Sequence, residues 1–407
     1  MKIKNIQKIK HPLAAIVTIV SFSVNVNVSA DVLVSGNVGV EARNFSDSSD
    51  QGGAELIDQT LGLASELEFK WQHSDFSFDM TLFGYRENQD EQRNRFNARE
   101  MLLRYYGGDW ELKAGIGQVF WGQTESQHRV DVINQTDRLG DIDGEDKLGQ
   151  RMINLTLIRD YGTFDIFALP SFTERDFSDG KGRFGFSIPV ANDATFEDKP
   201  AMEWAARWFY AYDQVEIALS YFDGIARDPL LVPQMAPQIG TQNEISLLPV
   251  YLPMQQFGFD SLYVNDATLW KLEVIQRKSN AEEFVAITTG FEYISVGLFG
   301  GAKDLGWIVE YSANSSDNPM IDVAQNDIFI GTRWIFNDND SSEVLVGLSQ
   351  DLDDSKSRYW SFEGSTRLTE SIRLSLNAYV FNAESQDDPL IFFRDDDFIQ
   401  LELTYHF

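Results

Sequence analysis

The sequence predicts an all-β fold, a transmembrane antiparallel up-and-down β-barrel of about 18 strands, with about 16 also possible. Two observations predict this fold. Apolar and polar residues alternate in one segment after another, and short turns alternate with long polar connections. No segment after residue 30 has the length and hydrophobicity of a transmembrane helix, and the mean hydropathy is −0.26. Strands that cross a membrane must close into a barrel, because every backbone polar group there needs a partner.

The alternation is clearest at the C-terminus, in the segment DFIQLELTYHF (397–407). Every second residue from Ile399 to Phe407 is apolar, and the residues between them are polar. The same pattern recurs in LGLASELEFKWQH (61–73), AMEWAARWFYAY (201–212), NDIFIGTRWIF (326–336) and RYWSFEGSTRL (358–368). In a soluble protein the apolar face would meet a core, whereas in a membrane barrel it meets lipid and the polar face meets the lumen. The repetition over so many segments favours the barrel.

The connections set the strand count. Short turns such as 73–75, 107–109 and 369–371 alternate with long polar segments such as 119–150 and 225–257, as periplasmic turns alternate with extracellular loops in such barrels. If both termini are periplasmic, the count must be even, and this requires an extra strand at 257–264. The predicted strands are 32–44, 61–72, 76–86, 98–106, 110–118, 151–159, 164–172, 201–212, 215–224, 257–264, 267–277, 282–293, 304–312, 326–336, 342–352, 358–368, 372–382 and 397–407.

The N-terminus predicts a secretory signal peptide. MKIKNIQKIKHP carries lysines and no acid, LAAIVTIVSFSV is a short apolar run, and small residues precede an expected cleavage site after Ala30. The apolar run is too short to span a bilayer comfortably, which argues against a membrane anchor. The expected organisation is therefore a signal peptide at 1–30 and one barrel at 31–407, located in the outer membrane of a Gram-negative bacterium.

Composition excludes several classes of function. The formal net charge of −30 argues against nucleic acid as a partner, because phosphates need a basic surface. The absence of cysteine excludes a disulfide framework. No phosphate-binding glycine loop or Cys/His metal spacing is present in the sequence, so we expect no cofactor. Aromatic residues make up 13% of the chain, which suits the aromatic belts of a membrane protein.

Charged residues at strand positions are expected to point into the lumen, because each charge at lipid depth would cost several kcal/mol. There they could select solutes by their field, or they could form a neutralised, hydrogen-bonded lining that only keeps the lumen wet. The candidate selectivity residues are Lys70, Arg104, Lys113, Glu203, Arg207, Lys271, Glu310, Arg333, Glu363 and Arg367.

The loop at 119–150 is the most prominent connection. It is long enough to fold into the barrel and narrow it, although a solvated surface loop is the alternative. A constriction there would carry the charges Glu125, Arg129, Asp131 and Arg138.

Two further kinds of site are a calcium site and a hydrolytic site. The stretch DIDGED offers the hard oxygens of Asp141, Asp143 and Glu145 around a glycine, but it lacks the remaining ligands of a calcium loop. A hydrolase would need a nucleophile, a base and an acid within reach. Only His128 lies near suitable partners, and no pairing is evident. We therefore predict no catalytic residue and no enzymatic activity, and an outer-membrane hydrolase is the minor alternative.

The signal peptide, the repeated strands and the terminal Tyr405–His406–Phe407 resemble bacterial outer-membrane barrels. The stretches 120–150, 290–311 and 326–347 are similar to an uncharacterised porin-like family of proteobacteria. This resemblance implies a barrel, its location and recognition of Phe407 by the barrel-assembly machinery. Taken with the charged lumen, we predict a porin-like channel for passive diffusion of small hydrophilic or amphipathic solutes. Outer-membrane lipid and lipopolysaccharide are further expected partners, and the oligomeric state stays open. The alternative is a plugged barrel acting as a surface receptor, an adhesin or a partner of an export system.

Overall fold

The structure is a computed structural model, and it describes residues 32–46, 57–140, 142, 144–178, 183–186, 188–191, 193–235, 245–316, 318, 324–385 and 388–407. The expected signal peptide, 1–30, lies outside the described residues. Among those described, no helix has the length and apolar character needed to cross a membrane.

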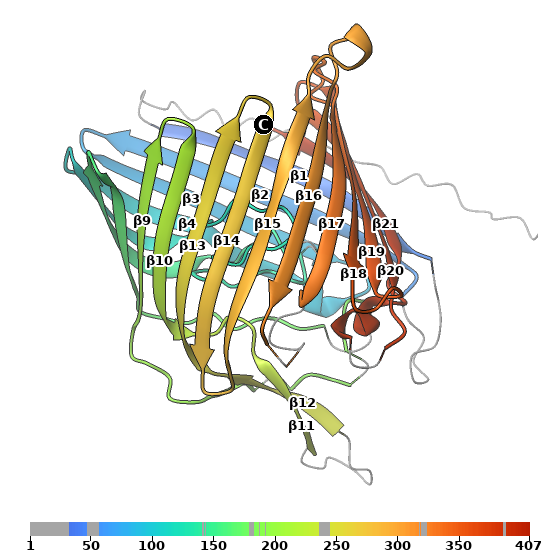
Figure 1. Ribbon diagram of the computed structural model, residues 1–407, viewed down its shortest axis with the longest axis horizontal. Helices are drawn as coiled ribbons and strands as arrows, with labels where there is room; N and C mark the ends of the chain where they lie inside the picture. Colours follow the sequence, from blue (N-terminus) through green and yellow to red (C-terminus); the bar gives the residue numbers. More distant parts are fainter. Residues whose placement is uncertain are drawn as a thin grey trace, which may run out of the picture.

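Eighteen antiparallel strands form one closed sheet. The strands tilt across the molecule and successive strands are neighbours (Figure 1). They are β1 (Val32–Phe45), β2 (Gln59–His73), β3 (Phe76–Glu87), β4 (Arg95–Tyr106), β5 (Trp110–Gly117), β6 (Gln150–Arg159), β7 (Gly162–Leu169), β9 (Glu203–Tyr212), β10 (Val215–Ile225), β13 (Pro253–Asn265), β14 (Thr268–Ser279), β15 (Glu283–Ser295), β16 (Asp304–Asn314), β17 (Asn326–Ile335), β18 (Glu343–Asp351), β19 (Arg358–Thr369), β20 (Ile372–Asn382) and β21 (Phe398–His406).

The barrel closes by pairing its first strand with its last. Asn37 on β1 lies opposite His406 on β21, and Gly36 and Phe407 exchange backbone hydrogen bonds of 3.1 and 3.0 Å. Closure leaves no free edge among these strands. The C-terminus lies at the end of the barrel with the short turns, which we call the short-turn end, and the opposite end is the long-loop end (Figure 1).

The predicted barrel is confirmed strand by strand. All 18 predicted segments are strands, and their predicted limits differ from the observed ones by at most four residues, at the start of β13. The segment that the even strand count required, 257–264, lies within β13. The alternation is also real: Leu401 and Leu403 are exposed on the outer face, whereas Gln400 between Ile399 and Leu401 is buried.

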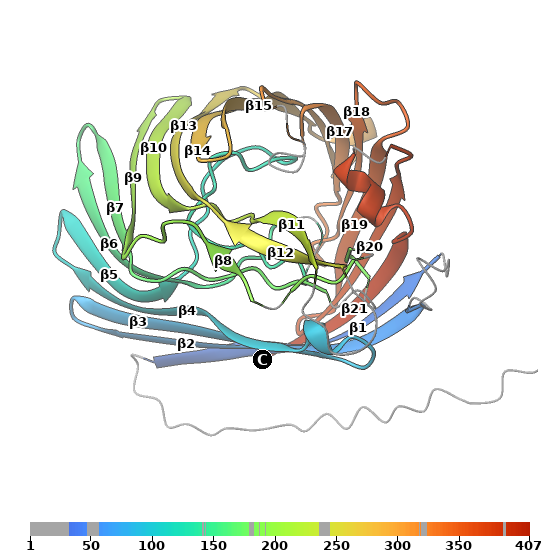
Figure 2. The ribbon, with the colours of Figure 1, turned by 90° about the horizontal axis from the view of Figure 1, so that it is seen from below.

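A second sheet of three strands was not predicted. It consists of β8 (Thr195–Phe196), β11 (Leu230–Met235) and β12 (Ile245–Tyr251) and lies across the long-loop end of the barrel (Figure 2). The rings of Phe172, Phe196 and Tyr251 pack together there, with centroids 4.8 to 5.5 Å apart. Three short 3-10 helices, η1 (Glu91–Arg93), η2 (Leu298–Gly300) and η3 (Pro389–Phe393), complete the described connections.

Candidate functional site

The connection between β5 and β6, residues 118–149, folds into the barrel, and we call it the inner loop. Seen from the long-loop end, its teal trace lies inside the ring of strands near β14 and β15 (Figure 2). The side chain of Asn134 ties its two ends together. It accepts a hydrogen bond from the N–H of Val119 (2.8 Å) and donates to the carbonyls of Gly117 (2.9 Å) and Leu148 (2.8 Å). The buried amide thus satisfies backbone groups that would otherwise lack partners.

The later part of the inner loop, which contains Asp137 and Asp146, is attached to β4. Asp137 forms a 2.8 Å ion pair with Arg95, and Asp146 forms a 3.3 Å ion pair with Arg99. The earlier part of the loop, the segment 123–130, reaches β14, β16 and β17 on the far side, through the contacts described next. The inner loop therefore crosses the barrel and divides its interior.

The carboxylate of Glu273, on β14, holds the segment 123–130 of the inner loop. Glu273 is fully buried, and its Oε1 accepts hydrogen bonds from the N–H of Gln123 (2.7 Å), the N–H of Thr124 (3.0 Å) and the Oγ1 of Thr124 (2.7 Å). Its Oε2 accepts from the N–H of Val130 at 3.2 Å. A hydrogen bond to a charged group contributes about 1.5–3 kcal/mol. One wall side chain thus fixes both ends of the segment 123–130.

A second carboxylate, that of Glu310 on β16, holds the tip of the same segment. Its oxygens accept from the N–H of Glu125 (2.8 Å), the N–H of Ser126 (2.8 Å) and the Oγ of Ser126 (2.7 Å). The ammonium of Lys271 lies 4.0 Å from Glu310 and 3.4 Å from Glu292. This cation offsets the negative charge of the buried Glu310 and of the partly buried Glu292.

Two glycines allow the close approach of loop and wall. Gly122 has a φ of +105°, and a Cβ there would lie 2.5 Å from Oε1 of Glu273. On the wall, a Cβ at Gly258 would lie 2.3 Å from Oγ of Ser220 and 3.1 Å from a methyl group of Val130. Larger residues at either position would move the inner loop away from the wall.

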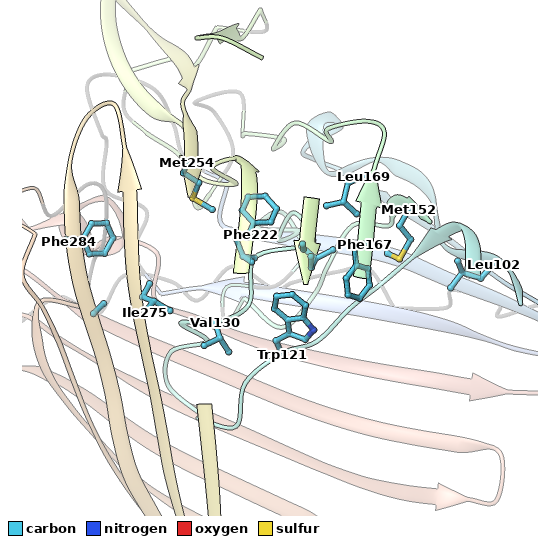
Figure 3. Close-up of a cluster of buried hydrophobic side chains, with 14 residues drawn as sticks. Leu102, Trp121, Val130, Met152, Phe167, Leu169, Phe222, Met254, Ile275 and Phe284 are labelled. Atoms are coloured by element: carbon cyan, nitrogen blue, oxygen red, sulfur yellow. The ribbon is translucent and has the colours of Figure 1, made fainter. Parts of the chain in front are cut away.

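An apolar cluster fills the space between the inner loop and the strands behind it. Trp121 and Val130 of the loop pack among inward-facing side chains of the wall, including Phe167, Phe222 and Ile275 (Figure 3). We expected the inward face to be polar throughout, and this part of it is not, because the loop rather than water covers it. The sequence signal was a continuous apolar run such as IFAL (166–169), where alternation fails.

Two of the predicted constriction residues are buried in contacts. Arg129 donates from Nε to the Oγ1 of Thr288 (3.1 Å) and from Nη2 to the carbonyl of Ala324 (2.9 Å). Asp131 forms an ion pair with Lys147 inside the loop. Both side chains hold the loop's shape, since removing one partner of a buried ion pair is costly.

The other two remain accessible. Glu125 forms a 2.8 Å ion pair with Arg333 on β17, and both side chains are partly exposed. Arg333 also lies 3.9 Å from Glu292. Arg138 is exposed at the long-loop end, where its Nη1 lies 3.5 Å from the carbonyl of Ile142.

The calcium hypothesis receives no support from the described residues. Asp141 and Asp143 lie outside them, and no group of three or more potential ligands is placed to hold a metal within the described part of the chain. Glu145 instead pairs with His128, with Nε2 and Oε1 2.6 Å apart. Burial alone would lower the pKa of His128, but the hydrogen bond and charge of Glu145 raise it above its ordinary value. The same hydrogen bond lowers the pKa of Glu145.

Four predicted lumen residues lie on the wall behind the inner loop and are buried. Lys271 and Glu310 belong to the group of side chains, described above, that holds the segment 123–130 of the inner loop. Arg207 forms two 2.7 Å hydrogen bonds with Asp260. Glu203 pairs with Arg227 at 3.0 Å. We call this side, formed by β6, β7, β9, β10 and β13–β16, the anchored wall.

The remaining predicted lumen residues lie on β17–β21 and β1–β5, which we call the open wall. Lys70 pairs with Glu68 at 3.2 Å, yet its side chain is 52% exposed. Arg104 lies 2.9 Å from Asp79 and 2.5 Å from Glu100, and about a quarter of it is exposed. These pairs neutralise one another but stay in contact with solvent.

The same holds farther around the open wall. Lys113 lies 3.7 Å from Glu111, and Glu363 accepts a 2.9 Å hydrogen bond from Tyr379. Arg367 is exposed near the short-turn end of β19. These predicted residues and their partners therefore give the open wall partly exposed charges of both signs.

Comparison with known proteins supports the fold. No protein-family model matches the sequence, and no curated protein does. Among solved structures, a BenF-like porin from Pseudomonas fluorescens is 11% identical over 93% of this chain and 97% of its own, with a TM-score of 0.54. Pseudomonas aeruginosa OpdQ is 12% identical over 93% and 97%, with a TM-score of 0.52. Escherichia coli Wzi, described as a carbohydrate-binding barrel involved in capsule assembly, is 13% identical over 90% and 83%, with a TM-score of 0.50. The chain thus shares the closed 18-stranded barrel of outer-membrane porins.

Proposed function

We propose that the protein is a porin-like channel of the outer membrane, through which small hydrophilic or amphipathic solutes diffuse passively. The signal peptide exports it, and its outer face, with exposed apolar side chains such as Leu401 and Leu403, contacts lipid. Phe407, at the end of the closing strand, presents the chain to the barrel-assembly machinery.

One observation carries this proposal: Glu273 and Glu310 fix the segment 123–130 of the inner loop to β14 and β16, so the loop is held inside the barrel and narrows its interior. The passage runs between the loop and the open wall. Its charged groups include Glu125 on the loop, and Arg333, Lys70 and Arg104 on the open wall. Facing charges of both signs favour polar solutes over apolar ones.

The test is single-channel recording of the refolded mature protein in a planar bilayer under a salt gradient. Stepwise conductance is expected, with a reversal potential biased towards cations by the acidic chain. A barrel that shows heat-modifiable folding and inserts, yet carries no current, would overturn the channel proposal.

A second function, binding at a covered mouth, is favoured by the β8, β11 and β12 sheet across the long-loop end (Figure 2). The structural likeness to Wzi suggests a carbohydrate as the ligand to test first. The discriminating experiment is removal of 230–251, which includes β11 and β12. A gatekeeping sheet predicts a larger conductance after removal, whereas a binding sheet predicts loss of carbohydrate affinity with no change in current.

A further inference from the structure

A hollow lies on the outer face of the barrel, separated from the lumen by the sheet itself. It has a volume of about 670 Å³ and spans β6, β7, β9, β10, β13 and β14. We call it the outer groove. Its size falls in the range of roughly 300–1,000 Å³ that is usual for small-molecule sites. Its lining is mostly apolar and includes Phe164, Ala206, Trp208, Tyr221, Phe257 and Val274, while Asp165, Arg207, Ser220 and Gln276 also contribute to it.

The outer groove owes its depth to one small residue. Ala206 lies between Ile166 on β7 and Tyr221 on β10, its partners in the sheet. Two residues farther along β9, Trp208 lies between Phe164 and Leu219. An alanine among aromatic and branched side chains leaves a recess where a larger residue would continue the convex surface.

Polar groups begin at the end of the groove nearer the long loops. The hydroxyl of Tyr221 donates to Asp223 (3.2 Å), and the amide of Gln255 donates to the same carboxylate (3.0 Å). Gln276 donates to Glu283 at 2.9 Å. Charges on the outer face of a barrel are costly at the bilayer midplane and become tolerable near its interface. The apolar groove therefore lies at hydrocarbon depth, and its polar end lies at headgroup depth.

We propose that the outer groove binds one acyl chain of a bilayer lipid, whose headgroup sits beside Gln255 and Gln276. The residues around the outer groove fit an amphiphile, because an apolar recess is continuous with amide and carboxylate groups at one end only. A bilayer supplies such chains at this depth, and burial of apolar surface drives the binding. Aromatic side chains such as Trp208 and Phe257 give the recess rigid walls.

The test is retention of a defined lipid by the full mature chain. The protein is refolded into vesicles of dioleoyl phosphatidylcholine, whose headgroup carries a cation that suits the carboxylates of Asp223 and Glu283, and it is then extracted into detergent and examined by native mass spectrometry. The wild-type protein is expected to retain one lipid. Ala206→Trp, which fills the recess, should lower retention about tenfold, which corresponds to about 1.4 kcal/mol.

The matched control is Ala378→Trp, since Ala378 lies on β20 between Phe362 and Ile399, on the outer face of the open wall. It should retain lipid as the wild type does, and heat-modifiable migration checks that each variant folds. If Ala206→Trp does not fold, Phe257→Ala replaces it. That side chain is 58% exposed, and loss of its ring removes an apolar wall of the groove, so lipid retention should fall here too.

Equal retention in the groove variant and its control would overturn the proposal. So would a wild-type protein that retains no lipid but forms an oligomer that Ala206→Trp splits, because the outer groove would then be an interface between copies of this chain.

Discussion

The anchored wall and the open wall are built from the same alternating strands, yet their inward residues meet different surroundings. On the anchored wall, Glu273 is completely buried against backbone amides of the inner loop. On the open wall, the side chain of Lys70 is half exposed beside Glu68. Alternation decides which way a side chain points, and the covering loop decides whether it meets water.

The difference also separates structural charge from functional charge. A buried carboxylate that accepts several hydrogen bonds cannot be removed without disturbing the loop, whereas an exposed pair contributes about 0–1 kcal/mol to stability. Substitutions on the anchored wall should therefore change structure first, and those on the open wall should change ion selectivity first.

The largest effect is expected from Glu273→Gln combined with Glu310→Gln. Neutral amides would weaken the bonds to the segment 123–130, and we expect local stability to fall by about 3 kcal/mol, or about 100-fold in hydrogen-exchange protection of its amides. Glu363→Gln is the matched control, because Glu363 accepts from Tyr379 on the open wall and should leave the loop amides protected. Unchanged exchange in the double variant would show that the carboxylates do not hold the loop.

Gly122→Ala should have the next largest effect. The substitution combines a strained positive φ with a Cβ 2.5 Å from Glu273, so we expect local destabilisation of about 1–3 kcal/mol. Gly108→Ala, with a φ of +87° and open space around the Cβ, isolates the backbone strain in a short turn. Protease cleavage within the inner loop should rise for Gly122→Ala only, and equal cleavage in both variants would contradict the close approach.

Charge reversal on the open wall should change selectivity with little change in stability. Lys70→Glu is expected to move the reversal potential further towards cations in a salt gradient, while the thermal unfolding midpoint stays the same. Lys271→Gln, on the anchored wall, should lower the unfolding midpoint instead. A fall in the unfolding midpoint for Lys70→Glu, together with a change in selectivity alone for Lys271→Gln, would contradict the distinction between the two walls.

The smallest effect concerns pH. The raised pKa of His128 contributes stability below its ordinary value of 6.5, and this is lost as pH rises through the folded value. The lowered pKa of Glu145 contributes above 4.5 and is lost as pH falls. The pair should therefore stabilise the inner loop most between these values. NMR titration of His128 should show a lower pKa in Glu145→Gln, and an unchanged pKa would exclude the pair in solution.

The barrel could be predicted from the sequence because lipid and water impose opposite demands on successive residues. The alternation located every barrel strand, and the even count recovered the segment within β13. The sheet of β8, β11 and β12 could not be found this way, since it lies outside the membrane-spanning strands. Its strand LLVPQM (230–235) even contains a proline, which argues against an internal strand.

The candidate site could be predicted only in outline. The sequence indicated that loop 119–150 enters the barrel, and it named Arg129 and Asp131 as charges at a constriction. It could not show that Arg129 reaches Thr288 or that Glu310 binds the tip of the loop, because these contacts join residues far apart in the chain. The alternation predicted that Glu310 and Glu363 both point into the lumen. In the structure Glu310 holds the inner loop, whereas Glu363 is accessible.

The pairing of β1 with β21 has a consequence for how the molecule forms. Asn37 and His406 are neighbours in space although nearly the whole mature chain separates them. Such a contact gives a high contact order and an expensive loop closure, so it forms late and slowly. The barrel cannot close until the last strand, β21, is available, so strand edges stay unpaired until then. The export proposed above therefore predicts that the unfolded chain needs a chaperone, because exposed strand edges favour aggregation.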